Sequence, residues 1–180
     1  MQTIETNKLA TYLSEGYTIL VSAEDGSALI GDANNDDLCR EISSLITNSN
    51  KGAMRILIDS DARLNRHVNE VPALAWDIID TAEQMVILIL NGGQNVSKYI
   101  LSDNDSIAIQ TAKDPLLKKL VQSAKCPLLL VEIESEDLPE SFASIDYMIN
   151  LPAPLLKSTA SKNIPIIFLG SDNEVRVIRE

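Results

Sequence analysis

Short apolar runs alternate with amphipathic stretches along the whole chain. Residues 85–90 are uniformly apolar over the length of one strand, which predicts a strand buried on both faces. Apolar residues recur at helical spacing through 116–121, directly after Asp114-Pro115, which predicts a helix with an N-terminal cap and a proline in its first turn. Alternating strands and helices of this kind are typical of an α/β domain.

The same patterns divide the rest of the chain into elements of ordinary length. Helices are predicted at 4–16, 38–46, 61–67, 71–82, 115–124 and 138–143, and strands at 17–21, 27–31, 54–59, 85–90, 106–110, 127–133, 146–149, 164–169 and 175–178. Turn residues at 24–26 and 171–173 predict hairpins near both ends of the chain, which excludes an all-parallel doubly wound sheet. We expect one domain over 1–180, an α/β fold with a twisted mixed sheet and flanking helices.

The charge narrows the class of partner. The formal net charge is −11, with 15 basic against 26 acidic residues, which is the wrong sign for a protein that grips RNA phosphates or an anionic membrane surface. The apolar runs are far shorter than the about 20 residues of a membrane span, so no membrane association is expected. An unidentified small molecule or a protein is the expected partner.

Two cysteines, Cys39 and Cys126, provide neither a disulfide framework nor a metal-ligand cluster. We expect both to be small buried side chains in a reducing, cytoplasmic compartment. No metal or cofactor is predicted. The acidic loop 32–37 lacks the central glycine and terminal glutamate of a calcium loop, and is expected to cap the helix that follows it.

Conventional catalytic motifs are absent. His67, the only histidine, has no Gly-x-Ser-x-Gly nucleophile motif to serve, and its polar surroundings predict an exposed or capping residue. Lys51-Gly52 and Gly92-Gly93 do not have the spacing of a phosphate-binding loop and are expected to be turns. Glu132 and Glu134 occupy alternate strand positions and share a face, which leaves open a pair of carboxylates. No catalytic residue is predicted from these patterns.

Several segments, in order, resemble the YrdC-like family. That family contains the L-threonylcarbamoyladenylate synthases of tRNA modification and the YciO branch. The matching segments are an opening helix followed by 16–21, then 53–58, 106–110 with 113–117, 126–129, 145–149, Ser158-Thr159 and 175–179. The resemblance spans nearly all of the chain and implies a YrdC/RibB-like fold.

The departures from the family fall where the synthases hold ATP and threonine. Ala23-Glu24-Asp25 replaces the family's Thr-Asp-Thr, and the family's Lys-x-Arg aligns with Ile46 to Asn48. The family's arginine after the third strand is replaced by Gln110, and its Ser-Ala-Asn is replaced by residues 132–134. Each lost cation removes a charge-assisted contact of about 1.5–3 kcal/mol. The resemblance therefore places the ligand cleft at Ser22, Glu24, Gln110, Glu132, Ser158 and Thr159. Of the family's polar site residues, only Ser158 and Thr159 are kept.

Three functions remain open at this level. The first is a YrdC-like domain without synthase catalysis, which fold analogy alone would label a translation factor or an RNA- or nucleotide-binding protein; the net charge disfavours RNA. The second is a working threonylcarbamoyladenylate synthase whose adenylate site uses other residues. The third is a protein-interaction module. If the cleft walls are acidic or filled by side chains, the synthase interpretation fails.

Overall fold

The computed structural model describes residues 6–23, 26–46, 53–133, 148–151 and 164–179. The chain begins with helix α1 (Thr6–Ser14) and the hairpin of β1 (Thr18–Ala23) and β2 (Gly26–Asp32), then forms α2 (Asp36–Leu45) and β3 (Met54–Ile58). A 3-10 turn and α3 (Leu64–His67) lead to α4 (Ala73–Thr81), β4 (Ile87–Leu90), β5 (Ile107–Thr111) and α5 (Pro115–Ser123). The remaining strands are β6 (Leu128–Ile133), β7 (Met148–Leu151), β8 (Ile166–Leu169) and β9 (Val175–Arg179).

The strands form one nine-stranded sheet in the order β7-β1-β2-β6-β3-β5-β4-β8-β9. Three neighbouring pairs are parallel (β1 with β7, β3 with β5, β4 with β8) and the others are antiparallel, so the sheet is mixed, as predicted. Both predicted hairpins are present, β1 with β2 and β8 with β9. The predicted helix at 138–143 lies outside the described residues.

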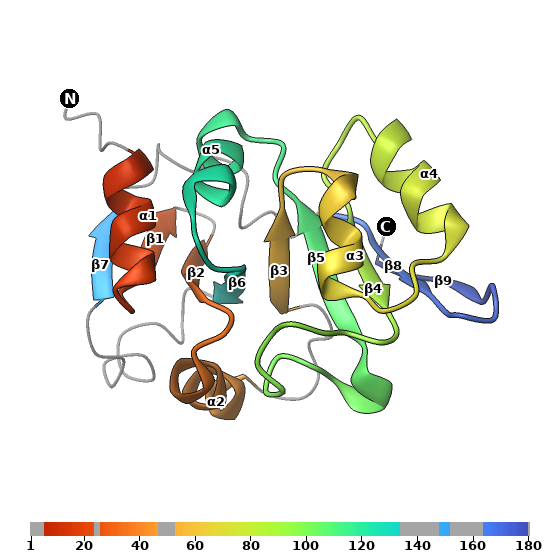
Figure 1. The fold of residues 1–180 in the computed structure, drawn as a ribbon, viewed down its shortest axis with the longest axis horizontal. Coiled ribbons are helices and arrows are strands. Elements are labelled where there is room, and N and C mark those ends of the chain that lie inside the picture. Colours follow the sequence, from red (N-terminus) through yellow and green to blue (C-terminus); the bar gives the residue numbers. More distant parts are fainter. Residues whose placement is uncertain (1–5, 24–25, 47–52, 134–147, 152–163, 180) are drawn as a thin grey trace.

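Local signals explain where two of the helices begin. Asn35 caps α2 by accepting a hydrogen bond from Leu38 N at 3.1 Å, so the acidic loop supplies the cap that the sequence predicts. Asp114 caps α5 through bonds from Leu116 N at 2.9 Å and Leu117 N at 3.0 Å, with Pro115 in the first turn. In Figure 1, α1 and α5 lie side by side near β1 and β2, and α3 and α4 lie near β4 and β5.

Two main cores lie on opposite faces of the sheet, because successive strand residues point to opposite sides. Ile56 joins a core with α2 and α4, whereas Leu57 joins a core with α1 and α5. A smaller cluster, which includes Ile87 and Ile166, covers the β4 and β8 part of the Leu57 face. Between that cluster and the core of α1 and α5, this face carries polar side chains.

Candidate functional site

The polar part of the sheet comes from three adjacent strands. Arg55 on β3 lies opposite Leu130 on β6, so Glu132, two residues further along β6, shares its face. Leu57 lies opposite Gln110 on β5, which puts Gln110 on the same face. The strand register alone thus brings together two predicted cleft residues, Gln110 and Glu132, around an arginine.

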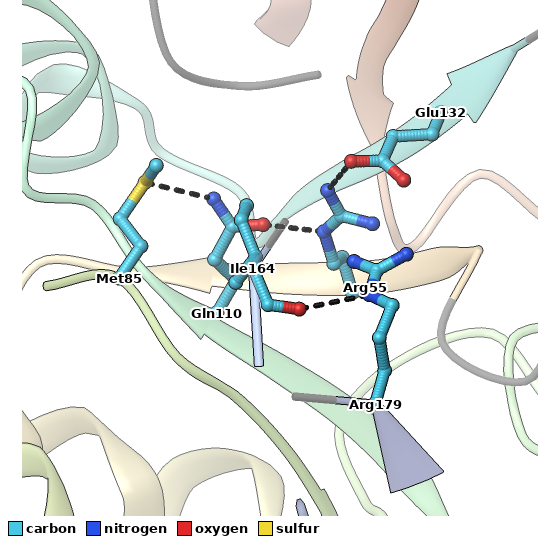
Figure 2. A network of polar contacts seen from close by, with 6 residues as sticks. All are labelled: Arg55, Met85, Gln110, Glu132, Ile164 and Arg179. Carbon is cyan, nitrogen blue, oxygen red and sulfur yellow. Dashed lines mark hydrogen bonds and ion pairs between the residues drawn. The ribbon is translucent and has the colours of Figure 1, made fainter. Parts of the chain in front are cut away.

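Arg55 is the centre of this polar network, which consists of Arg55, Gln110 and Glu132. Its Nη2 donates to Glu132 Oε1 at 2.7 Å, and its Nε donates to Gln110 Oε1. The Gln110 amide nitrogen in turn faces Met85 Sδ at 3.5 Å. Figure 2 shows the chain of contacts running from Met85 to Glu132 across the face of the sheet. The side chains are thus held by one another.

The network is almost closed to solvent. Arg55 is 1% exposed and Gln110 0% exposed, while the Glu132 side chain is 20% exposed. Burial lowers the pKa of the Arg55 guanidinium, and the hydrogen-bonded Glu132 carboxylate opposes that shift. A buried cation of this kind is tolerated because a carboxylate and an amide oxygen replace its water shell.

Arg179, on β9, lies beside the network. Its Nε donates to Ile164 O at 2.9 Å, and its Nη2 is buried without a hydrogen-bond acceptor among the described residues. Its charge further disfavours the protonated form of Arg55. Figure 2 shows the two guanidinium groups close to each other. Sequence reasoning did not select Arg55 or Arg179 as site residues, although a charged residue inside the apolar strand 54–58 is a detectable signal.

Of the other predicted cleft residues, Ser22 is the one within the described part of the chain. Ser22 belongs to β1, opposite Ser27 on β2, but its side chain is not described. Glu24, Ser158 and Thr159 lie outside the described residues, as does Glu134, the second member of the possible carboxylate pair. Glu132 itself is ion-paired with Arg55.

An open cavity of about 720 Å³ lies next to the network, at one end of the sheet, and its lining includes residues from both faces. It sits where β3 and β5 begin and β4 and β8 end, so Ala108, two residues before Gln110, lines it. Apolar side chains such as Ile89, Ala108 and Phe168 contribute to its wall, together with acidic residues at 103, 172 and 174. Arg176 is the cation among the described lining residues.

Three titratable side chains lie away from the network in the described part of the chain and have shifted pKa values: His67, Cys39 and Cys126. His67 is buried, not exposed as predicted, because Leu64 and Val68 beside it belong to the core; burial lowers its pKa. Burial raises the pKa of both thiols to about 12, with Cys39 buried and Cys126 half-buried. Among the described residues, no three His, Cys, Asp or Glu side chains are grouped to hold a metal ion, and no helix is long and apolar enough to cross a membrane.

The amino-acid sequence matches a known protein family. A model for Sua5, YciO and YrdC proteins, described as "Telomere recombination", matches residues 11–150. A search of curated protein sequences gives no match.

Solved structures show the same fold at low sequence identity. The H234A/Y235A form of P. abyssi Sua5 superimposes with a TM-score of 0.74 at 15% identity, covering 99% of this chain and 57% of Sua5. E. coli YciO gives 0.72 at 16% identity, covering 99% of this chain and 90% of YciO. Full-length HypF in its phosphate- and nucleotide-bound form gives 0.69 at 15%, covering 99% of this chain and 29% of HypF. The chain therefore spans only part of the Sua5 and HypF chains.

Proposed function

The chain belongs to the Sua5, YciO and YrdC family, and on that premise we propose that it is a YrdC-like domain that has lost threonylcarbamoyladenylate synthesis. The observation that carries the proposal is the buried ion pair of Arg55 and Glu132, bridged to Gln110. These residues stand at or beside positions that the family resemblance assigns to the nucleotide cleft.

The network uses hydrogen-bond donors of Arg55 that a nucleotide phosphate would otherwise need. Pyrophosphate binding needs cations whose hydrogen-bond donors are free to face the ligand. Two of the Arg55 donors are used by Gln110 and Glu132, and the guanidinium is 1% exposed. Glu132 places a carboxylate where the family has Ser-Ala-Asn, and a carboxylate repels phosphate. These contacts within the family's cleft positions support the proposal over the synthase interpretation.

Calorimetric titration with ATP and Mg²⁺ tests the proposal. We expect no binding heat up to about 1 mM ATP, the concentration at which even a weak site of −4 kcal/mol would be half-filled. We also expect no release of pyrophosphate when threonine and bicarbonate are added. A micromolar Kd together with threonine-dependent pyrophosphate release would establish the active synthase instead.

A charge-matched pair of variants sharpens this test. The double variant Gln110→Arg with Glu132→Ser replaces a neutral group by a cation and removes the carboxylate. We expect ATP binding to become measurable in this variant. Asp77→Lys makes the same change in net charge on the exposed side of α4, and we expect it to leave ATP unbound. Equal gains in the two proteins would show that overall charge, and not the network, excludes the nucleotide.

A further inference from the structure

We propose that the cavity beside the polar network binds a small organic cation, an amine or a guanidine carried on an apolar body. The cavity measures about 720 Å³, within the range of sites that enclose small-molecule ligands. This inference rests on the proposed loss of nucleotide binding, and it specifies the class of ligand that the remaining cavity admits.

The wall of the cavity is suited to an apolar body. Ile89 on β4 and Ala108 on β5 are 6% and 7% exposed and lie directly opposite each other on neighbouring strands. Phe168 on β8, opposite Ile89, adds an aromatic ring to the same wall. Ile46, at the end of α2, adds another apolar side chain. A ligand that covers these side chains removes apolar surface from water.

The rim of the cavity is acidic. Asp103, Asp172 and Glu174 line it, against the single cation Arg176 among the described lining residues. Glu174 Oε1 is paired with Arg176 Nε at 2.7 Å, which leaves Asp103 and Asp172 as the excess negative charge. Within the described part of the chain, Asp172 Oδ1 accepts a single hydrogen bond, from the backbone Glu174 N at 3.2 Å. An anionic ligand would therefore be repelled and a cationic one attracted, as the net charge of −11 also favours.

Arg176 shows how a cation is held in this cavity. Its guanidinium carbon lies 4.5 Å from the centre of the Phe168 ring, within the range of a cation–π contact, and its Nε is paired with Glu174. An aromatic face and a carboxylate thus already bind one guanidinium, supplied by the chain itself. Because the Arg176 side chain is 56% exposed, it is able to move aside for a free cation that makes the same two contacts.

Three probes with one skeleton test the charge preference. 4-Phenylbutylamine, 4-phenylbutanol and 4-phenylbutyrate carry a cation, a neutral group and an anion on the same apolar body. We expect the amine to bind about tenfold more tightly than the carboxylate, the size of effect that two exposed ion pairs produce together, and less tightly as salt is added. Calorimetry and ¹⁵N chemical shifts at residues 99–108 and 168–178 report the affinity and the place of binding. Equal affinities, no binding at about 10 mM, or shifts elsewhere would overturn the proposal.

Two pairs of variants separate a site from a general charge effect. Asp172→Asn should weaken amine binding several-fold, while Asp80→Asn, an equal charge change on the exposed side of α4, should not. Arg176→Gln should strengthen amine binding, because it removes the internal competitor. Arg40→Gln removes an equally exposed arginine from a 2.7 Å pair with Asp37 and should change nothing. Equal effects within either pair would refute the site, whatever the ATP titration shows.

Discussion

At the scale of single residues, the most consequential feature is a charge buried by its neighbours. Arg55 is 1% exposed, and its carboxylate partner Glu132 lies 77 positions further along the chain. Removing water from a cation costs several kcal/mol, and a well-placed carboxylate and amide offset that cost without a large net gain. The network is therefore expected to be sensitive to the loss of one partner and tolerant of the loss of both.

Glu132→Ala should lower the free energy of unfolding by about 3 kcal/mol, because it leaves Arg55 buried without its carboxylate. The double variant Arg55→Leu with Glu132→Leu should cost clearly less, since neither charge remains. Urea unfolding followed by circular dichroism measures both. A double variant that is destabilised as much as Glu132→Ala, or more, would show that the unpaired charge is not the source of the loss.

His67 gives a second expectation at this scale, in pH dependence. Its pKa in the folded protein is lowered by burial from 6.5, so the unfolded chain binds more protons just below that pH. The free energy of unfolding should therefore fall as the pH drops below about 6.5, and the loss should level off below the folded pKa. Arg63 and Arg66 lower the pKa further, in the same direction. Urea unfolding of the wild type and of His67→Gln at pH 5 to 8 measures the difference in their free energies of unfolding. That difference should change with pH in the way described for His67. A difference that is constant over this pH range would contradict the expectation.

At the scale of elements, caps and strand register determine what the site is made of. The cap of α5 is the clearest local case, because the Asp114 carboxylate accepts two backbone hydrogen bonds directly before Pro115. The pairing register of β3 with β5 and β6 is the long-range case, because it places Arg55, Gln110 and Glu132 on one face of the sheet. A shift of one residue would turn each side chain to the opposite face.

Asp114→Ala should destabilise the fold by about 1 kcal/mol, the usual cost of a lost N-cap. Asp114→Asn keeps an oxygen acceptor and should lose only a fraction of that amount. Thermal unfolding of the two variants beside the wild type distinguishes them. An equal loss in both would indicate that the negative charge, and not the hydrogen bonds, stabilises the start of α5.

At the scale of the whole molecule, the sheet separates a filled region from an open one. On one face, the polar network lies between the core of α1 and α5 and the smaller cluster near β4 and β8. The open cavity follows directly, where β3 and β5 begin. Exposed apolar residues of β9, Val175 and Val177, mark one edge of the sheet. The proposed loss of one ligand and the proposed binding of another thus concern neighbouring parts of one sheet.

The sequence by itself determined the class of fold, the hairpins and the caps, because these depend on spacing and turn chemistry within a few residues. The family resemblance also located Gln110 and Glu132 as cleft residues. Arg55, which joins these two residues, was identified by the tertiary structure alone. Strand order and register place Arg55, on β3, between β5 and β6, which are distant in sequence. The same holds for the burial of His67 and for the cavity, whose described walls come from α2, five strands and the segment 99–104. Local patterns do not encode which distant residues share a surface.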